Sequence, residues 1–187
     1  MARFKPLTES SMSEAQRKAM QELVSGPRGK FNPHGPNALL LRSPDLMART
    51  QKVGEYLRYR ISLPERLKEF AIIVTAREWG AQVEWLEHQP MAIKAGLDPA
   101  AAEDLAQGRR PARLNDDEAA VYDFLKELHA THGVSDANFA RVADRFGEQG
   151  VIDLIGLTGY YTMLAMVLNV GQEPLPEGKP APLQPLR

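Results

Sequence analysis

One segment of the sequence, from Arg77 to His88, has residue types and spacing that suit proton transfer. Glu84 and His88 are four residues apart, so on a helix they would share one face. A carboxylate beside an imidazole orients the ring and stabilises its protonated form. The pair is therefore a candidate for general acid–base catalysis. The structural alternative is an ion pair on the surface.

The chain contains no cysteine among its 187 residues. Thiol nucleophiles, disulfides and thiolate metal sites are therefore excluded. No second histidine or aspartate lies at ligand spacing near Glu84 and His88. Since a metal needs three or four such ligands, we expect no metal at this site.

Other polar residues have two interpretations each. His34, in an Asn-Pro-His-Gly-Pro loop, could add a second acid–base group over a pocket, or lie in a surface turn. Tyr160 lies on an apolar helix, where it could line a pocket with His88 or bond to backbone within an oligomer. Trp85 is expected in the core or in a pocket wall. His129 and His132 are expected on the surface, near a helix C-terminus.

Capping signals predict the helices that must position these side chains. Capping boxes are read at Ser11–Glu14, Ser62–Glu65 and Asn115–Glu118. Apolar spacing then predicts helices over about 11–24, 43–60, 62–79, 83–95, 98–108, 115–132, 135–146 and 151–170, with an irregular loop over 31–37. No convincing strand is found. The fold class expected is all-α, a bundle of seven or eight helices.

The length and composition of the chain favour one domain over residues 1–172, followed by a proline-rich tail over 173–187. The net charge of -1 gives no basic excess for nucleic acid, so no nucleic-acid partner is expected. The N-terminal residues lack the apolar core of a signal peptide, which makes the cytoplasm the default. Residues 151–170 are apolar, but we expect a buried helix or a subunit interface there and no membrane span.

Several elements in order carry a resemblance to a known family. They are Leu63-Pro64-Glu65-Arg66-Leu67-Lys68-Glu69, an apolar helix, Glu84-x-x-x-His88, and Ala95-Gly96-Leu97. Over about residues 40–110 the chain resembles the carboxymuconolactone decarboxylase family, which includes the alkylhydroperoxidase D-like proteins. The resemblance implies the all-α bundle of that family and a homo-oligomer, a trimer or hexamer.

The resemblance also assigns roles. In the hydroperoxidase branch a glutamate serves two cysteines and a histidine. Glu69 and His88 match the glutamate and the histidine, but the cysteine positions fall on Ala81 and Glu84. Because disulfide exchange needs both thiols, thiol peroxidase activity is not expected.

The decarboxylase branch is implied instead, with Glu84 and His88 in its Glu-x-x-x-His pattern. The reaction removes CO2 from a small anionic lactone in aromatic-compound catabolism and needs no cofactor. His88 would donate the proton, and Glu84 or Glu69 would orient it. Arginines would hold the substrate carboxylates. The candidates are Arg77, Arg58 and Arg60.

Two alternatives stay open. One is an enzyme of the same fold with other chemistry, such as a hydratase, lactonase or isomerase. The other is a non-catalytic binding protein, which predicts that Glu84 and His88 are exposed to solvent.

Overall fold

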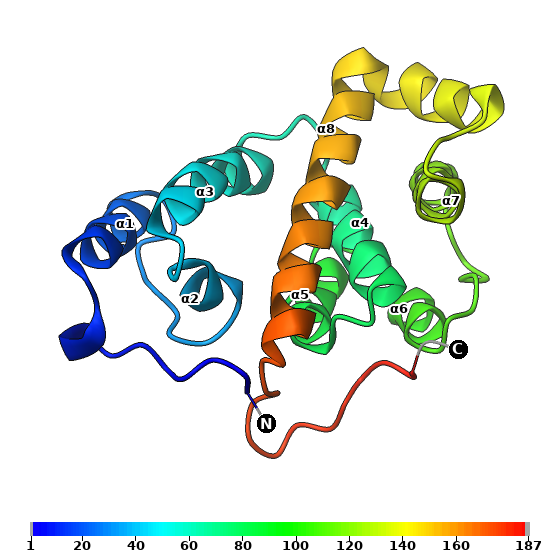
Figure 1. Ribbon diagram of the computed structural model, residues 1–187. Coiled ribbons are helices and arrows are strands. Elements are labelled where there is room, and N and C mark those ends of the chain that lie inside the picture. Colours follow the sequence, from blue (N-terminus) through cyan, green and yellow to red (C-terminus); the bar gives the residue numbers. More distant parts are fainter. Residues whose placement is uncertain (1, 186–187) are drawn as a thin grey trace. The chain divides into compact units, whose positions relative to one another are not determined.

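The computed structural model describes residues 2–185, and within them every regular element is helical (Figure 1). A short 3-10 helix, η1, is followed by eight α-helices. Their bounds are η1 Glu9–Ser11, α1 Glu14–Ser25, α2 Pro36–Leu40, α3 Pro44–Tyr59, α4 Glu65–Glu78, α5 Gln82–Lys94, α6 Pro99–Ala106, α7 Asp116–Thr131 and α8 Asp136–Gly171. The all-α class predicted from the sequence is confirmed.

The chain groups into two compact units. The first comprises the residues up to Ile61 together with Met163–Pro174, and the second comprises Ser62–Thr162 together with the residues from Leu175. The C-terminal turns of α8 thus belong to the first unit and the rest of α8 to the second.

In the first unit, α1 and α2 both pack on α3. The buried side chains there include Leu23 of α1, Leu41 after α2, and Met47 and Leu57 of α3. Within α1 the buried residues are Ala19 and Leu23, and within α3 the buried positions are 47, 50, 51, 54 and 57, a helical spacing that places one face of each helix in the core.

The second unit is built around α4, which contacts α5, α6 and α7. All ten residues from Leu67 to Ala76 are buried, so this helix is enclosed on all faces. Most of them are apolar, as expected for a central helix. Lys68, Glu69 and Thr75 are the exceptions, and each of these polar side chains needs a partner in the core.

Some predicted caps are confirmed and others are wrong. Asn115 and Glu118 form the reciprocal capping box at the start of α7. The first box is formed by Ser13 and Gln16, two residues later than predicted. Ser62 does not cap α4, because the helix begins at Glu65 and its N-cap is Pro64; the N–H and hydroxyl of Ser62 instead donate to the Asp153 carboxylate, at 3.0 and 2.6 Å.

Two further helix predictions need correction. Pro36–Leu40 forms the helix α2 inside and beyond the stretch predicted to be an irregular loop. The two predicted C-terminal helices are joined into α8, whose backbone leaves helical geometry at Gly147, with φ of 68°. Figure 1 shows this as a sharp bend in the yellow part of the ribbon. Since positive φ is cheap only for glycine, the predicted break at this residue is confirmed.

By length and composition α8 could cross a membrane. Core helices of soluble proteins pass the same test. In this protein 56% of its most apolar 18-residue window is buried inside the structure. The helix therefore serves as core at least in part.

Candidate active site

The centre of the second unit holds a buried carboxylate–imidazole pair. Glu69 comes from α4 and His88 from α5, and their exposed fractions are 0% and 5%. The Oε2 atom of Glu69 lies 2.7 Å from Nδ1 of His88. A carboxylate only accepts hydrogen bonds, so Nδ1 carries the hydrogen and donates it when Glu69 is ionised. This arrangement fixes the orientation and tautomer of the imidazole ring.

A buried lysine supports the negative charge of Glu69. Lys68, 2% exposed, places Nζ 3.9 Å from Oε1 of Glu69 and also pairs with Glu65. A cation at this distance favours the ionised carboxylate. Sequence reasoning assigned Lys68 no role. The signal available was a charged residue next to Glu69 within an apolar helical run.

Aromatic rings from α8 form one wall of the site. The Tyr161 ring meets the His88 ring edge-to-face, with centroids 5.0 Å apart. Tyr160 meets Tyr161 in the same manner at 5.4 Å. Trp85, 3% exposed, lies one turn before His88 on α5. Trp85 and Tyr160 are thus both buried in this unit, and their roles in binding a substrate stay predictions.

Glu84 lies on the same helix as His88 but does not pair with it. Its carboxyl group is 3% exposed, and neither oxygen has a hydrogen-bond partner among the described residues. Burial raises the pKa of the Glu84 carboxyl well above its ordinary value, and the charge of Glu87 raises this pKa further. A carboxyl group in this environment favours its neutral, proton-carrying form.

The remaining predicted binding residues have other partners. Arg77, at the far end of α4 from Glu69, donates from Nη1 to the backbone carbonyl of Gln184 at 2.5 Å. His34 belongs to the first unit, where its Nδ1 lies 3.5 Å from a carboxylate oxygen of Glu173. Arg60, also in the first unit, pairs with Glu55. Their roles in binding a substrate stay predictions.

The contacts of a second histidine, His129, were not predicted from the sequence. His129 was predicted on the surface, but it is half-buried, and its Nε2 lies 3.2 Å from Oγ1 of Thr158. The Thr158 hydroxyl lies 2.7 Å from that of Thr75, which donates to the carbonyl of Ala71. Since each hydroxyl has one hydrogen, Thr158 donates to Thr75 and His129 donates to Thr158. The chain of hydrogen bonds thus sets the imidazole tautomer.

We expect His129 to make stability depend on pH. Burial lowers its pKa; Lys126 acts in the same direction and Glu78 opposes it. The unfolded chain then takes up a proton first as the pH falls below about 6.5, so the free energy of unfolding decreases until the folded protein is protonated too. Urea unfolding of both proteins between pH 5 and 8 isolates this effect: as the pH falls, the free energy of unfolding of the wild type should decrease relative to that of His129→Gln. The exposed His132→Gln variant is the control, and an equal effect there would contradict the prediction.

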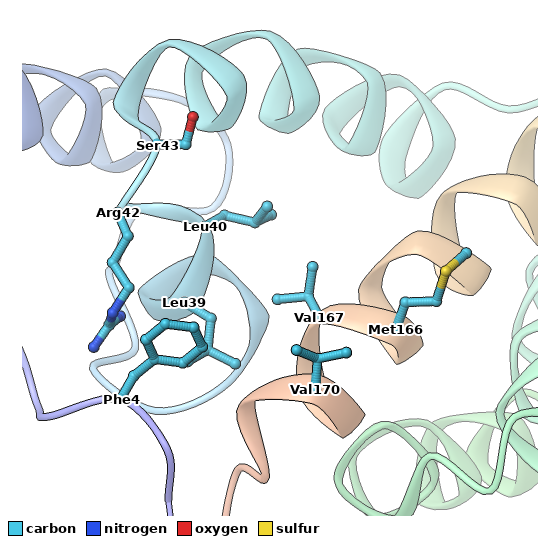
Figure 2. Close-up of a pocket in the computed structure, with 8 residues that line it drawn as sticks. All are labelled: Phe4, Leu39, Leu40, Arg42, Ser43, Met166, Val167 and Val170. Carbon is cyan, nitrogen blue, oxygen red and sulfur yellow. The ribbon is translucent and has the colours of Figure 1, made fainter.

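The first unit contains a hollow of about 380 Å³ with a different character. Figure 2 shows apolar side chains from the N-terminal segment, α2 and the last turns of α8 around it. Its lining is Phe4, Leu39, Leu40, Arg42, Ser43, Met166, Val167 and Val170. Arg42 donates to the carbonyls of Ala38 and Lys5 and lies over the Phe4 ring. Its charge is therefore engaged, and the hollow offers no acid–base pair like that of the second unit.

Among residues 2–185 no group of three or more histidine, aspartate or glutamate side chains is arranged to hold a metal ion.

Helices and site together define an all-α bundle with a buried acid–base pair in its core. Solved structures share this fold. The debrominase Bmp8 without ligand is 14% identical, with a TM-score of 0.68 over 95% of this chain and 92% of that one. A Bmp8 variant with a cysteine replaced by alanine, in complex with 2,3,4-tribromopyrrole, is 15% identical, with the same TM-score over 97% and 96%. At this identity the likeness establishes a common fold.

No protein-family model matches the sequence, and no curated protein matches it either.

Proposed function

We propose that this protein is a carboxymuconolactone decarboxylase-like enzyme, which removes CO2 from a small anionic lactone by acid–base catalysis without a cofactor. The observation that carries the proposal is the buried hydrogen bond between Glu69 and His88. It occurs at the two positions that the family resemblance assigns to a glutamate and a histidine.

The geometry suits the protonation that completes such a reaction. When CO2 leaves, the electrons of the broken C–C bond pass into the conjugated lactone, and a proton must then be added to carbon. With Nδ1 held by Glu69, a proton exchanged between His88 and a ligand passes through Nε2. The raised pKa of Glu84 favours the proton-carrying form of this carboxyl, which makes Glu84 a second candidate to donate a proton or a hydrogen bond to the developing negative charge.

Burial also bears on the non-catalytic alternative. That alternative predicts exposed side chains at positions 84 and 88, whereas Glu84 and His88 are 3% and 5% exposed. Burying ionisable groups costs stability, and the carboxyl of Glu84 is buried without a hydrogen-bond partner among the described residues, which is typical of groups that a site uses. The common fold with a debrominase that is crystallised with a small ring compound supports an enzyme as well. The absence of cysteine excludes any step carried by a thiol of this chain.

The test is incubation of the purified chain with 4-carboxymuconolactone, following CO2 release and the ultraviolet spectrum. Release of CO2 in equal amount to the lactone consumed is the expected result. Consumption of lactone without CO2 would reject decarboxylation and favour a hydratase, lactonase or isomerase. No consumption at all would reject this substrate.

The assembly and location predicted from the sequence remain proposals. We propose a homo-oligomer, a trimer or hexamer, in the cytoplasm. Size-exclusion chromatography with light scattering would measure the molar mass of the protein in solution. A mass of 20.8 kDa, that of one chain, would reject the oligomer.

A further inference from the structure

The C-terminal segment is held on the second unit by a leucine side chain and its backbone. Leu183 is 3% exposed, although the residues from Pro176 to Ala181 are all exposed. The side-chain amide of Gln82 bonds both polar groups of the Leu183 backbone. Nε2 of Gln82 donates to the Leu183 carbonyl at 3.0 Å, and the Leu183 N–H donates to Oε1 at 2.9 Å.

The backbone of the next residue, Gln184, makes two further contacts. Arg77 donates from Nη1 to the carbonyl of Gln184 at 2.5 Å. The N–H of Gln184 points to the carbonyl of Ala106 at the end of α6, at 3.5 Å. The segment is therefore bound mainly through its backbone, with one side chain in the core.

This is the pattern by which proteins bind extended peptides. Hydrogen bonds to the main chain give affinity, and a pocket for one side chain gives specificity. Prolines at positions 182 and 185 flank the bound residues. Because proline fixes φ and favours an extended backbone, such a segment loses little conformational entropy on binding.

The attachment of the C-terminal segment through Leu183 is of a kind that can open locally while the rest of the protein stays folded. A single buried leucine ends a long exposed stretch, and segments with few buried apolar contacts open at low cost in free energy. The groups that receive the segment belong to α4, α5 and α6, which are packed on one another. The receiving surface therefore does not depend on the segment for its backbone structure.

We propose that Arg77, Gln82 and the end of α6 form a binding site for an extended, proline-flanked leucine segment, and that residues 175–185 are a releasable latch occupying it within the same chain. Gln82 is the first residue of α5. The latch thus fastens the helical turn that also carries Glu84, two residues later.

Hydrogen exchange on the full-length protein tests the bound state. The Leu183 amide should be protected in the wild type, and in Gln82→Ala it should exchange about tenfold faster or more, as expected for a lost backbone hydrogen bond. Amides of α7 serve as the internal reference and should not change. An unprotected Leu183 amide in the wild type would overturn the proposal.

Binding in trans tests the site itself. The probe is a fluorescent peptide with the sequence of residues 177–185, added to full-length protein carrying Leu183→Ser, which should leave the site open. We expect it to bind this variant at least about tenfold more tightly than the wild type, whose own leucine side chain competes. Lys179→Ser, on the exposed part of the tail, is the matched control and should behave as the wild type.

Three outcomes would contradict the proposal. Equal peptide binding by the wild type and Leu183→Ser would mean that the latch does not occupy the site. No loss of binding when Gln82→Ala is added to Leu183→Ser would remove Gln82 from it. A lower molar mass for Leu183→Ser than for the wild type would place the segment on a second copy and overturn the assignment to the same chain.

Discussion

Replacing His88 with asparagine is expected to lower kcat/KM on the lactone substrate by about 10²–10⁴-fold, the usual contribution of a positioned acid–base group. The side-chain nitrogen of asparagine replaces Nδ1 closely, so it keeps a donor for Oε2 of Glu69, 2.7 Å from Nδ1 in the wild type. The variant loses the second ring nitrogen, and with it the atom that exchanges a proton with the ligand.

The measurement is steady-state kinetics by CO2 release, with a thermal melt to show that the variant folds. His132→Asn is the control, because His132 is exposed at the C-cap of α7 and should leave activity unchanged. Glu69→Gln provides an independent check. An amide oxygen still accepts from Nδ1 but no longer stabilises the imidazolium, so activity should fall here too. Unchanged activity in His88→Asn would reject His88 as the acid.

Replacing Glu84 with glutamine is expected to stabilise the protein while lowering its activity. The pKa of Glu84 is raised well above the ordinary value of 4.5 by burial. As the pH rises above the ordinary value of 4.5, the unfolded chain releases the Glu84 proton while the folded protein keeps it. The contribution of Glu84 to the stability of the wild type therefore falls with rising pH, by at most about 1.4 kcal/mol per pH unit, until the pH reaches the folded pKa.

Glutamine cannot ionise, so the variant escapes this loss. The difference in free energy of unfolding between Glu84→Gln and the wild type should grow with pH above about 4.5, and urea unfolding across pH 4–8 would measure it. Glu148→Gln, at an exposed position of α8, should show little of this trend. A difference that stays constant with pH would mean that Glu84 is not held neutral. A loss of CO2 release in Glu84→Gln despite its higher stability would mark Glu84 as a working group.

The sequence predicted the fold better than the contacts in the site. Caps and helix breaks depend on residues close in the chain, so the capping box at Asn115 and the bend at Gly147 were predicted correctly. Ser62 has the same local signal, but α4 begins after Pro64 and Ser62 bonds to a residue distant in the chain, Asp153. Local patterns carry no information about such a competitor.

In the site, too, features set by residues close in the chain were predicted, and contacts between distant residues were not. Helical spacing correctly places Glu84 and His88 on one helix, but a carboxylate from another helix, that of Glu69, holds His88. Only the family resemblance pointed to Glu69. His129 was predicted on the surface because the last turn of a helix favours a cation. Its hydrogen bond to Thr158, on α8, depends on helix packing, which single-sequence patterns do not reveal.

Gly108, beyond the end of α6, limits which related chains could keep the same latch. Its φ is 75°, and a Cβ atom added there would lie 2.7 Å from Nη2 of Arg77. A larger residue at position 108 would thus displace the guanidinium that holds Gln184. Related chains that have the latch should accordingly share four residues with this one, and chains that lack the latch should be free to lose all four. These residues are Arg77, Gln82, Gly108 and Leu183.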